Sequence, residues 1–377
     1  MKRSERKIQS ATNWQFILGL LCVVFLVASG ILLAEKINDS VKTKPTKTSI
    51  VQKKKTSSSP NDVQTARIMA NGDLLYHDLL YMSALQSDGT YDFTENYQYV
   101  KPWLKKADLV LGDFEGTIRP NYPLAGYPLF NAPESVVSAI KDAGYQVVDL
   151  AHNHILDSQL VGVFSTAKAF EQQGITPIGV YTHKNRDKAS LVIKKVNGIK
   201  IALLAYSYGF NGLEENISHA DYNHHLSDLN EEKMKKEIKQ AEKEADITVV
   251  MPQMGVEYQL EPTQEQKTLY HKMIEWGADI IFGGHPHVVE PSEVVTQNGQ
   301  KKFIIYSMGN FISNQRIETM DGLENKKWTE RGVLMDVTIE KSQKGTIIKN
   351  VQAHPSWVSR VAKGTYSPEG YPLYTYQ

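Results

Sequence analysis

The chain has 377 residues, and its 42 Lys and Arg residues balance its 42 Asp and Glu residues, so the formal net charge at pH 7 is zero. The length suggests about two domains or one large α/β domain. With 41% hydrophobic residues, the composition is that of a globular protein. The single cysteine, Cys22, excludes an intrachain disulfide and a zinc site built on thiolates.

Charge is distributed unevenly along the chain. Residues 1–60 carry eleven Lys and Arg against three Asp and Glu, which leaves 31 basic and 39 acidic residues for the remainder. An acidic body of this kind argues against nucleic acid as its partner, because nucleic-acid-binding domains are basic.

An uncharged apolar run covers residues 16–34. At about 1.5 Å per residue, a helix of that length reaches roughly 28 Å and can cross a bilayer. Four basic residues in the preceding segment, 1–15, favour a cytoplasmic N-terminus and an extracellular body. A cleaved signal peptide is the competing interpretation, but the length of the run favours a retained anchor. We therefore expect a single-pass protein of the cell membrane.

Residues 35–62 are rich in Lys, Ser and Thr and nearly lack large apolar residues. This composition predicts a disordered linker. The remaining residues, 63–377, are expected to form the folded domain.

In the folded domain, short β-rich runs alternate with amphipathic runs. The expected strands are 67–73, 107–113, 145–151, 199–207, 246–253, 279–284, 302–309 and 332–339. The expected helices are 134–143, 159–173, 231–245 and 264–276. Alternation of this kind predicts an α/β fold.

Polar residues follow six of these strands. In chain order they are Asp73; Asp113 and Glu115; Asn153, His154 and Asp157; Gln253 and Glu257; His285 and His287; and Asn310. In open α/β sheets, ligands bind outside the carboxyl ends of the strands, so we expect these clusters to converge. Carboxylates, amides and imidazoles together suit one or two divalent ions of Mn, Fe, Zn or Mg.

Each cluster taken alone also has a structural interpretation. A His-x-His pair can be satisfied within its own loop, Asn153 can cap a strand, and Asp113 or Asn310 can begin a turn. The histidine-rich stretch 218–225 resembles a second metal site, but it lacks patterned carboxylates and is predicted to be a surface loop. Tyr206, Tyr208 and Phe210 follow a strand and could line the cleft, but core packing is the default expectation.

The ordered series of motifs resembles a known family. "GDLL", "DFE", "AHNHILD", "QMGVEY", "GGHPHV" and "YSMGNF" occur in this order between residues 67 and 312. The series is similar to the CapA/PgsA branch of the calcineurin-like metallophosphoesterases, which act in capsule and poly-γ-glutamate synthesis. The resemblance implies a metallophosphoesterase-like sandwich of two mixed β-sheets flanked by helices, preceded by the transmembrane helix.

The resemblance also implies roles for individual residues. The metal ligands that it implies are Asp73, Glu115, Asn153, His285 and His287, with Asp113 as an additional one. His154 would be the proton donor, with Asp157 holding its ring, and the residues assigned to substrate are His77, Glu257 and Asn310.

Two positions depart from the pattern of that branch. Gln253 stands where a histidine is usual, and an amide oxygen is a poorer ligand than imidazole for zinc. Gly284 stands for the first of three histidines. We therefore expect one metal to bind well and a second to bind weakly, through Gln253.

The function that the resemblance implies is capsule or poly-γ-glutamate synthesis and export, together with a membrane ligase and export subunits. Two alternatives stay open. One is a metal-dependent hydrolase in which His154 protonates the leaving oxygen. The other is a non-catalytic scaffold that holds an anionic polymer of the cell envelope. Whether the protein is an enzyme is left undecided by the sequence.

Overall fold

The computed structural model describes residues 63–377. The predicted cytoplasmic segment, anchor and linker, residues 1–62, lie outside the described residues. Within residues 63–377, no helix combines the length and the apolar character that crossing a membrane requires.

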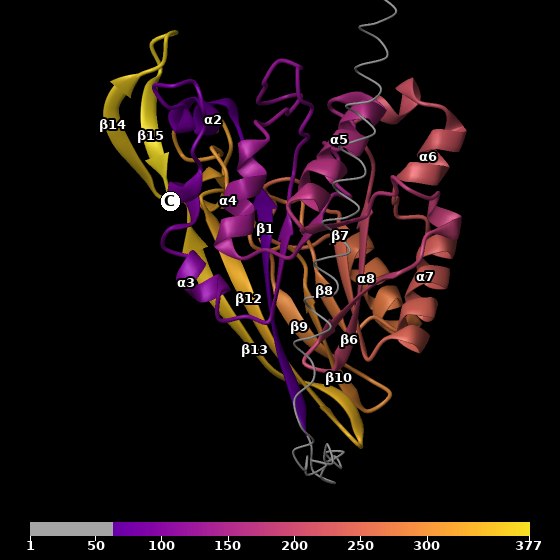
Figure 1. The fold of residues 1–377 in the computed structure, drawn as a ribbon. Helices are drawn as coiled ribbons and strands as arrows, with labels where there is room; N and C mark the ends of the chain where they lie inside the picture. Colours follow the sequence, from indigo (N-terminus) through magenta and orange to yellow (C-terminus); the bar gives the residue numbers. More distant parts are fainter. Residues whose placement is uncertain (1–62) are drawn as a thin grey trace, which may run out of the picture. The chain divides into compact units, whose positions relative to one another are not determined.

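The first sheet has seven strands in the order β13-β12-β1-β2-β3-β4, with β11 paired to β1. Their bounds are β1 Gln64–Leu74, β2 Leu109–Asp113, β3 Val147–Asp149, β4 Thr176–Ile178, β11 Asn310–Ile312, β12 Arg331–Ser342 and β13 Gly345–Trp357. Strands β1 to β4 are parallel, whereas β12 and β13 run antiparallel to their neighbours. Figure 1 shows the long strands β1, β12 and β13 together in this mixed sheet.

The second sheet has six strands in the order β5-β6-β7-β8-β10-β9. Their bounds are β5 Val192–Val196, β6 Ile199–Ser207, β7 Ile247–Gln253, β8 Ile280–Phe282, β9 Ser292–Gln297 and β10 Gln300–Ile305. It too is mixed, because only the edge strands β5 and β9 are antiparallel. A separate hairpin is formed by β14, Arg360–Tyr366, and β15, Pro372–Tyr376.

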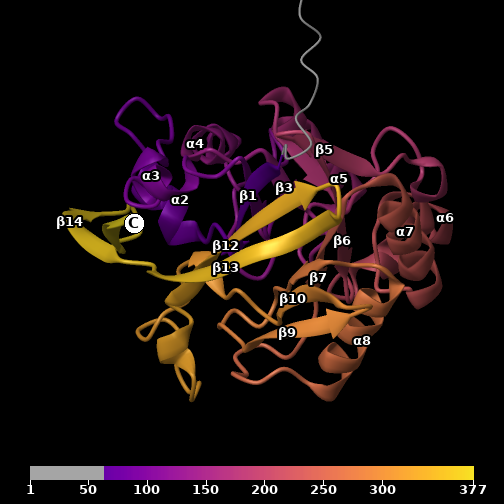
Figure 2. The ribbon, with the colours of Figure 1, turned by 90° about the horizontal axis from the view of Figure 1, so that it is seen from below.

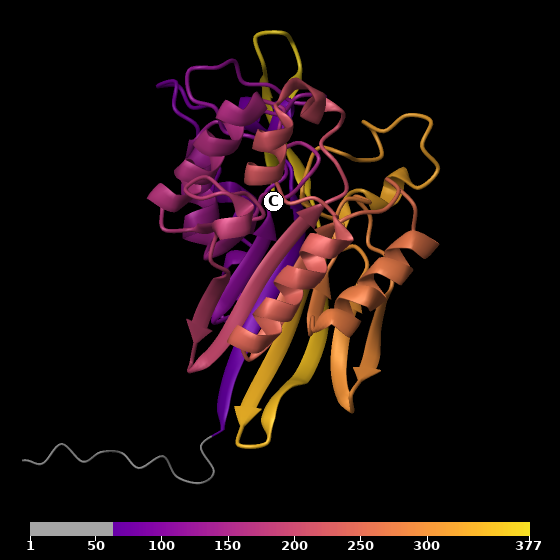
Figure 3. The ribbon, with the colours of Figure 1, turned by 90° about the vertical axis from the view of Figure 1, so that its right-hand side faces the viewer.

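The helices cover the outer faces of the two sheets. They are α2 Asp78–Ala84, α3 Lys101–Leu104, α4 Ser135–Ala143, α5 Gln159–Gln172, α6 His219–His225, α7 Glu231–Glu244 and α8 Gln264–Trp276. In the view from below, α7 and α8 lie on one side and α2 and α4 on the other, with strands of both sheets between them (Figure 2). The side view in Figure 3 shows α7 and α8 lying along the strands of the second sheet.

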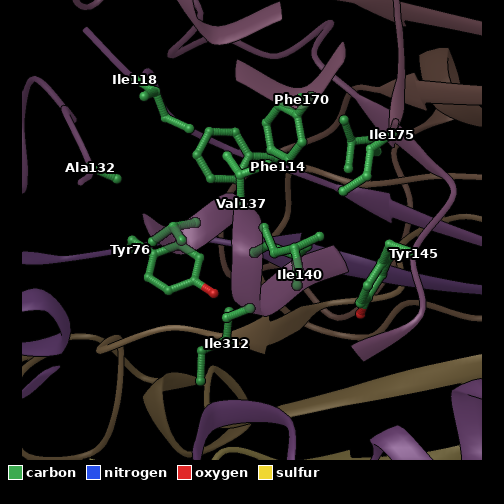
Figure 4. Packing of buried hydrophobic residues seen from close by; sticks show 14 of the residues in the cluster. Tyr76, Phe114, Ile118, Ala132, Val137, Ile140, Tyr145, Phe170, Ile175 and Ile312 are labelled. Atoms are coloured by element: carbon green, nitrogen blue, oxygen red, sulfur yellow. The ribbon is translucent and has the colours of Figure 1, made fainter. Parts of the chain in front are cut away.

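Alternation along the strands produces this layering. In β6, Ile201 and Leu203 pack into the core between the sheets, while Ala202 and Leu204 pack against α7 and α8. The outer core of the first sheet lies under α4 and α5, where Phe114 meets Phe170 with ring centroids 5.0 Å apart (Figure 4). Two mixed sheets flanked by helices are the architecture that the family resemblance implies, and the α/β class is the one that the alternating pattern predicts.

The helix at residues 264–276 has the predicted bounds because its start is capped. The Thr263 hydroxyl accepts the Gln266 backbone N–H, and the Gln266 side chain accepts the Thr263 backbone N–H. Such a reciprocal capping box satisfies two otherwise free donors at the helix start.

The prediction for residues 218–225 is right about their position at the surface but wrong about the loop. The segment contains helix α6, which begins because the Ser218 hydroxyl accepts the backbone N–H of Asp221. A serine at this position caps a helix as readily as it begins a turn, and the polar composition concealed the difference.

Candidate metal centre

Residues at the ends of parallel strands from both sheets meet at one edge of the sandwich. In the first sheet, the strand register places Asp73 beside Asp113 on one side and beside Asn310 on the other. In the second sheet, Gln253 is bridged to Gly284. Neighbouring strands lie about 4.8 Å apart. Register therefore brings Asp73, Asp113 and Asn310 together within the first sheet, and Gln253 and Gly284 together within the second.

Contacts between the sheets join these clusters into one site. His287 Nδ1 lies 2.8 Å from Asp73 Oδ2 and 3.2 Å from Asn310 Oδ1. On the other flank, the Asn153 backbone N–H donates to Gln253 Oε1 across 2.7 Å. The structure therefore brings together side chains that are up to 214 positions apart in the chain.

The centre of the site is formed by Glu115, His285 and His287. Each of these buried residues offers a ligand atom, and the three atoms lie within 4.8 Å of one another. The nearer carboxylate oxygen of Glu115 is 3.8 Å from His287 Nδ1. Two imidazoles and a carboxylate at this spacing form a donor set that suits divalent transition metals.

Several buried ligand atoms at the site lack a hydrogen-bond partner anywhere in residues 63–377. They are Asp73 Oδ1, Asp113 Oδ1, both oxygens of Glu115, and His285 Nδ1. An unsatisfied buried polar atom costs about 1–3 kcal/mol, and more if it is charged. A cation between Glu115, His285 and His287 would satisfy the orphan atoms of Glu115 and His285, so the residues present fit a metal ion.

The backbone at the two histidines is held in an uncommon conformation. His285 has φ 95° and His287 has φ 58°, a region that non-glycine residues seldom adopt. Strain of this kind costs about 1–3 kcal/mol and tends to cluster at functional sites. It is consistent with a loop whose shape serves to aim two imidazole rings.

The electrostatics of the cluster depend on burial and on mutual charge. Burial opposes a charged ring at His287, but Glu115 and Asp73 raise the pKa of His287 to about 10. Burial, assisted by the charge of His287, lowers the pKa of His285 to about 3. Burial raises the pKa of Glu115 to about 7. Without a metal ion, the imidazolium of His287 therefore balances the neighbouring carboxylates.

We expect the affinity for Mn²⁺ or Zn²⁺ to rise as the pH rises from 6 to 9. His287 is protonated throughout most of that range and Glu115 below about pH 7, and a cation must displace those protons. Each proton released makes the apparent affinity rise about tenfold per pH unit. Calorimetry at pH 7, in buffers of different ionisation enthalpy, counts the protons. Binding without proton release would contradict this assignment.

Asn153 and Gln253 are engaged with each other. Gln253 Oε1 accepts the Asn153 backbone N–H at 2.7 Å and the Ser207 hydroxyl at 3.2 Å. Gln253 Nε2 donates to Asn153 Oδ1 at 3.1 Å. These hydrogen bonds fix the orientation of the Gln253 side-chain amide. If the amide were flipped, its NH₂ group would face the backbone N–H of Asn153. Both oxygens already have partners, so a ligand role for either residue remains a prediction.

His154 and Asp157 form the hydrogen-bonded pair that the sequence suggested. His154 Nδ1 lies 2.8 Å from Asp157 Oδ2, which also accepts the Phe130 backbone N–H at 2.6 Å. The Phe130 ring packs edge-on against the imidazole, with centroids 4.7 Å apart. Burial opposes the charged ring, but the bond to Asp157 and the charge of Glu115 raise the pKa of His154 above its ordinary value. The ring is thus held in place, and its protonated form is favoured relative to a free imidazole.

The three residues assigned to substrate have different surroundings. Asn310 is fully buried, and its amide donates to Gln315 and to the Thr329 carbonyl while its oxygen faces His287. It is therefore placed to orient His287. His77 is partly buried, and Glu257 is exposed on the loop after β7.

Sequence reasoning missed two features of the site. Asp149, at the end of β3, is paired in register with Asp113, and together with burial it holds the pKa of Asp113 well above its usual range. Tyr208 is 45% exposed, and its ring lies 4.5 Å from that of His285, so the default of core packing is wrong for it and the alternative position beside the site holds; the contact with His285 itself was not predicted. Tyr206 and Phe210 do pack in hydrophobic cores.

Gly284 has a specific position at the site. A side chain there would begin 3.1 Å from Asp113 Oδ2 and 3.6 Å from Asp73 Oδ1. A histidine at this position, as in the resembling branch, would project toward these two carboxylates. With glycine at position 284, no imidazole nitrogen from this position is available beside Asp113 and Asp73.

Comparisons with known proteins identify the family of the chain. Residues 67–315 match the family described as "Bacterial capsule synthesis protein PGA_cap". "Capsule biosynthesis protein CapA" of Bacillus anthracis is 33% identical over 228 residues, covering 58% of this chain and 54% of the relative. "PGA biosynthesis protein CapA" of Bacillus subtilis (strain 168) is 34% identical over 228 residues, covering 58% and 57%. The match thus spans little more than half the length of these relatives.

Solved structures were also compared with the chain. A putative 5′-nucleotidase from Staphylococcus aureus, in complex with α-ketoglutarate, gives a TM-score of 0.48 at 12% identity, covering 78% of this chain and 55% of that one. The calcineurin-like phosphoesterase YfkN from Bacillus subtilis gives 0.41 at 14% identity, covering 78% and 91%. Because the family match extends over more than half of the residues, the chain belongs to the bacterial capsule synthesis protein PGA_cap family.

Proposed function

We propose that this protein acts in the synthesis of a capsule polymer, with poly-γ-glutamate as the first candidate, and that it does so through a divalent metal ion bound at Glu115, His285 and His287. Family membership supports the capsule role. The observation that carries the metal role is the convergence of buried ligand atoms that have no partner in residues 63–377.

The ion would be held mainly by Glu115, His285, His287 and Asp73, with Asp113 at its edge. Mn, Fe, Zn and Mg all accept such a mixed oxygen and nitrogen donor set. A bound ion would supply Lewis-acid polarisation of a phosphoryl or carbonyl oxygen. Asn310 orients His287, and such second-layer partners commonly tune a metal site.

The pair His154–Asp157 favours a catalytic version of this function, in which the protein is a metal-dependent phosphoesterase or related hydrolase of the metallophosphoesterase type. A protonated imidazole fixed by a carboxylate can donate its proton to a leaving oxygen. Tyr208, Glu257 and His77 would then contact the substrate. The other candidate is a non-catalytic scaffold, in which the bound ion neutralises an anionic polymer segment on an otherwise acidic body.

The N-terminal segments complete the proposal. Residues 16–34 would anchor the chain in the cell membrane, with residues 1–15 in the cytoplasm and the domain at 63–377 outside. A protein in that position would work beside a membrane ligase and export subunits.

The proposal is tested in cells that lack this protein and have lost their surface polymer. The wild-type chain is expected to restore polymer, whereas His285→Ala/His287→Ala is not. His219→Ala, on α6 and outside the metal cluster, is the matched control and should restore polymer fully. Full restoration by the double variant would contradict a metal-dependent role. Restoration by His154→Ala would favour the scaffold over the hydrolase.

A further inference from the structure

An aromatic groove of about 510 Å³ lies between α3, with the turn before it, and the end of β13. Phe311 and Leu334 are among the residues that line it. Phe311 follows Asn310, which contacts His287, so the groove begins one residue away from the metal site. Nothing in the proposed metal chemistry requires this groove.

The walls carry large aromatic rings that are exposed and yet fixed in place. Tyr99 is 67%, Trp103 is 43% and Trp357 is 62% exposed. The Trp103 ring lies 4.9 Å from the His354 ring, with the Lys106 ammonium 4.1 Å from its centroid. Trp357 Nε1 donates to Glu330 across 3.0 Å. Rings that are fixed by such contacts and are still partly exposed are preorganised to bind a flat ligand face.

The side chains that line the groove are uncharged, although the Lys106 ammonium lies against the Trp103 ring. Among the described residues that line it, none is Asp, Glu, Lys or Arg, and Nε2 of the lining His354 is already 3.2 Å from Asp336. Its polar groups are amides and hydroxyls. Two of these atoms, Asn96 Oδ1 and Ser356 Oγ, are buried and have no hydrogen-bond partner within residues 63–377. An uncharged lining of this kind suits a ligand that forms hydrogen bonds without bringing charge.

We propose that this groove binds a neutral glycan segment, with pyranose rings stacked on Trp103 and Trp357. The face of an aromatic ring carries negative charge density and attracts the C–H groups on the face of a sugar ring. The hydroxyls at the edge of that sugar would satisfy Asn96 and Ser356. A polyanion such as poly-γ-glutamate would instead bury many carboxylates against a lining that contains no Lys or Arg, which is costly.

This inference predicts saturable binding of β-1,4-linked hexasaccharides of glucose or N-acetylglucosamine to the full chain in detergent. Calorimetry is expected to show that Trp103→Ala and Trp357→Ala each weaken the binding by about tenfold or more, because tryptophan anchors dominate such interfaces. Trp357→Phe, which keeps a ring, should lose less. The matched control is Trp328→Ala, which removes a 38% exposed tryptophan outside the groove and should bind normally.

Three outcomes would overturn the glycan assignment. The first is an absence of saturable binding by either hexasaccharide to the folded chain. The second is binding that survives both alanine variants. The third is binding of poly-γ-glutamate that the same two variants abolish, which would assign the groove to a peptide polymer. Because chelator and His285→Ala should leave sugar binding unchanged, failure here is distinguishable from failure of the metal proposal.

Discussion

The double variant His285→Ala/His287→Ala is expected to abolish divalent-metal binding. These side chains supply both nitrogen donors of the buried cluster, and only Glu115 remains of the three groups that converge within 4.8 Å. Losing a single outer-layer partner of a metal ligand typically weakens binding by roughly 10–100-fold. Losing two direct ligands should therefore raise the dissociation constant by more than about 100-fold.

Mass spectrometry of metal content after dialysis against Mn²⁺ or Zn²⁺ measures this loss. The control pair His219→Ala/His224→Ala removes two histidines of α6, outside the cluster, and should keep the wild-type content. Removal of His287 also leaves Asp73 without its imidazolium partner, and it can weaken the fold. His285→Ala alone avoids that problem and should still lower the affinity. Wild-type metal content in both variants would refute the ligand assignment.

The second large effect is expected for His154→Ala, which should lower phosphoester turnover by about 10²–10⁴-fold while metal binding persists. The pKa of His154 is raised, so the ring is protonated below that pKa and can donate a proton. Turnover should therefore fall as the pH rises through the raised pKa. Asp157→Asn, which loses the charge but keeps a hydrogen-bonding group, should cause a smaller loss and lower that pKa.

Hydrolysis of p-nitrophenyl phosphate and of its bis ester, with Mn²⁺ present, provides the assay. His183→Ala, which removes a histidine exposed on the surface, is the matched control and should turn over normally. Equal turnover by His154→Ala and the wild type would contradict the proton-donor role. A wild-type protein that holds its metal but hydrolyses neither ester would favour the scaffold function.

Features of the fold that depend on local sequence could be predicted. The strand at residues 199–207 has the predicted bounds. Its nearly continuous run of apolar residues matches a strand that is buried on both faces. The helix at 264–276 was equally predictable, because its capping residues adjoin it. Two strands of three residues, β4 and β11, carry too little pattern and were not predicted, whereas β3 and β8 lie within longer apolar runs that were.

The site was predictable as a set of strand ends but not as a network. Motif order and residue type indicated that Asp73, Glu115, His285 and His287 would converge, and the structure brings them together. The pairing of Asn153 with Gln253 depends on side-chain geometry across 100 positions of the chain, which no local pattern encodes. The same holds for Asp149, whose effect on Asp113 arises from the strand register.

Anomalous diffraction from crystals of the protein grown or soaked with Mn²⁺ tests the central claim most directly. The claim predicts a manganese peak at about 2.0–2.3 Å from the converging atoms of Glu115, His285 and His287. A second, weaker peak toward Asn153 and Gln253 would extend the site to two ions. No peak at this site at saturating Mn²⁺, or a peak only elsewhere in the molecule, would contradict the account.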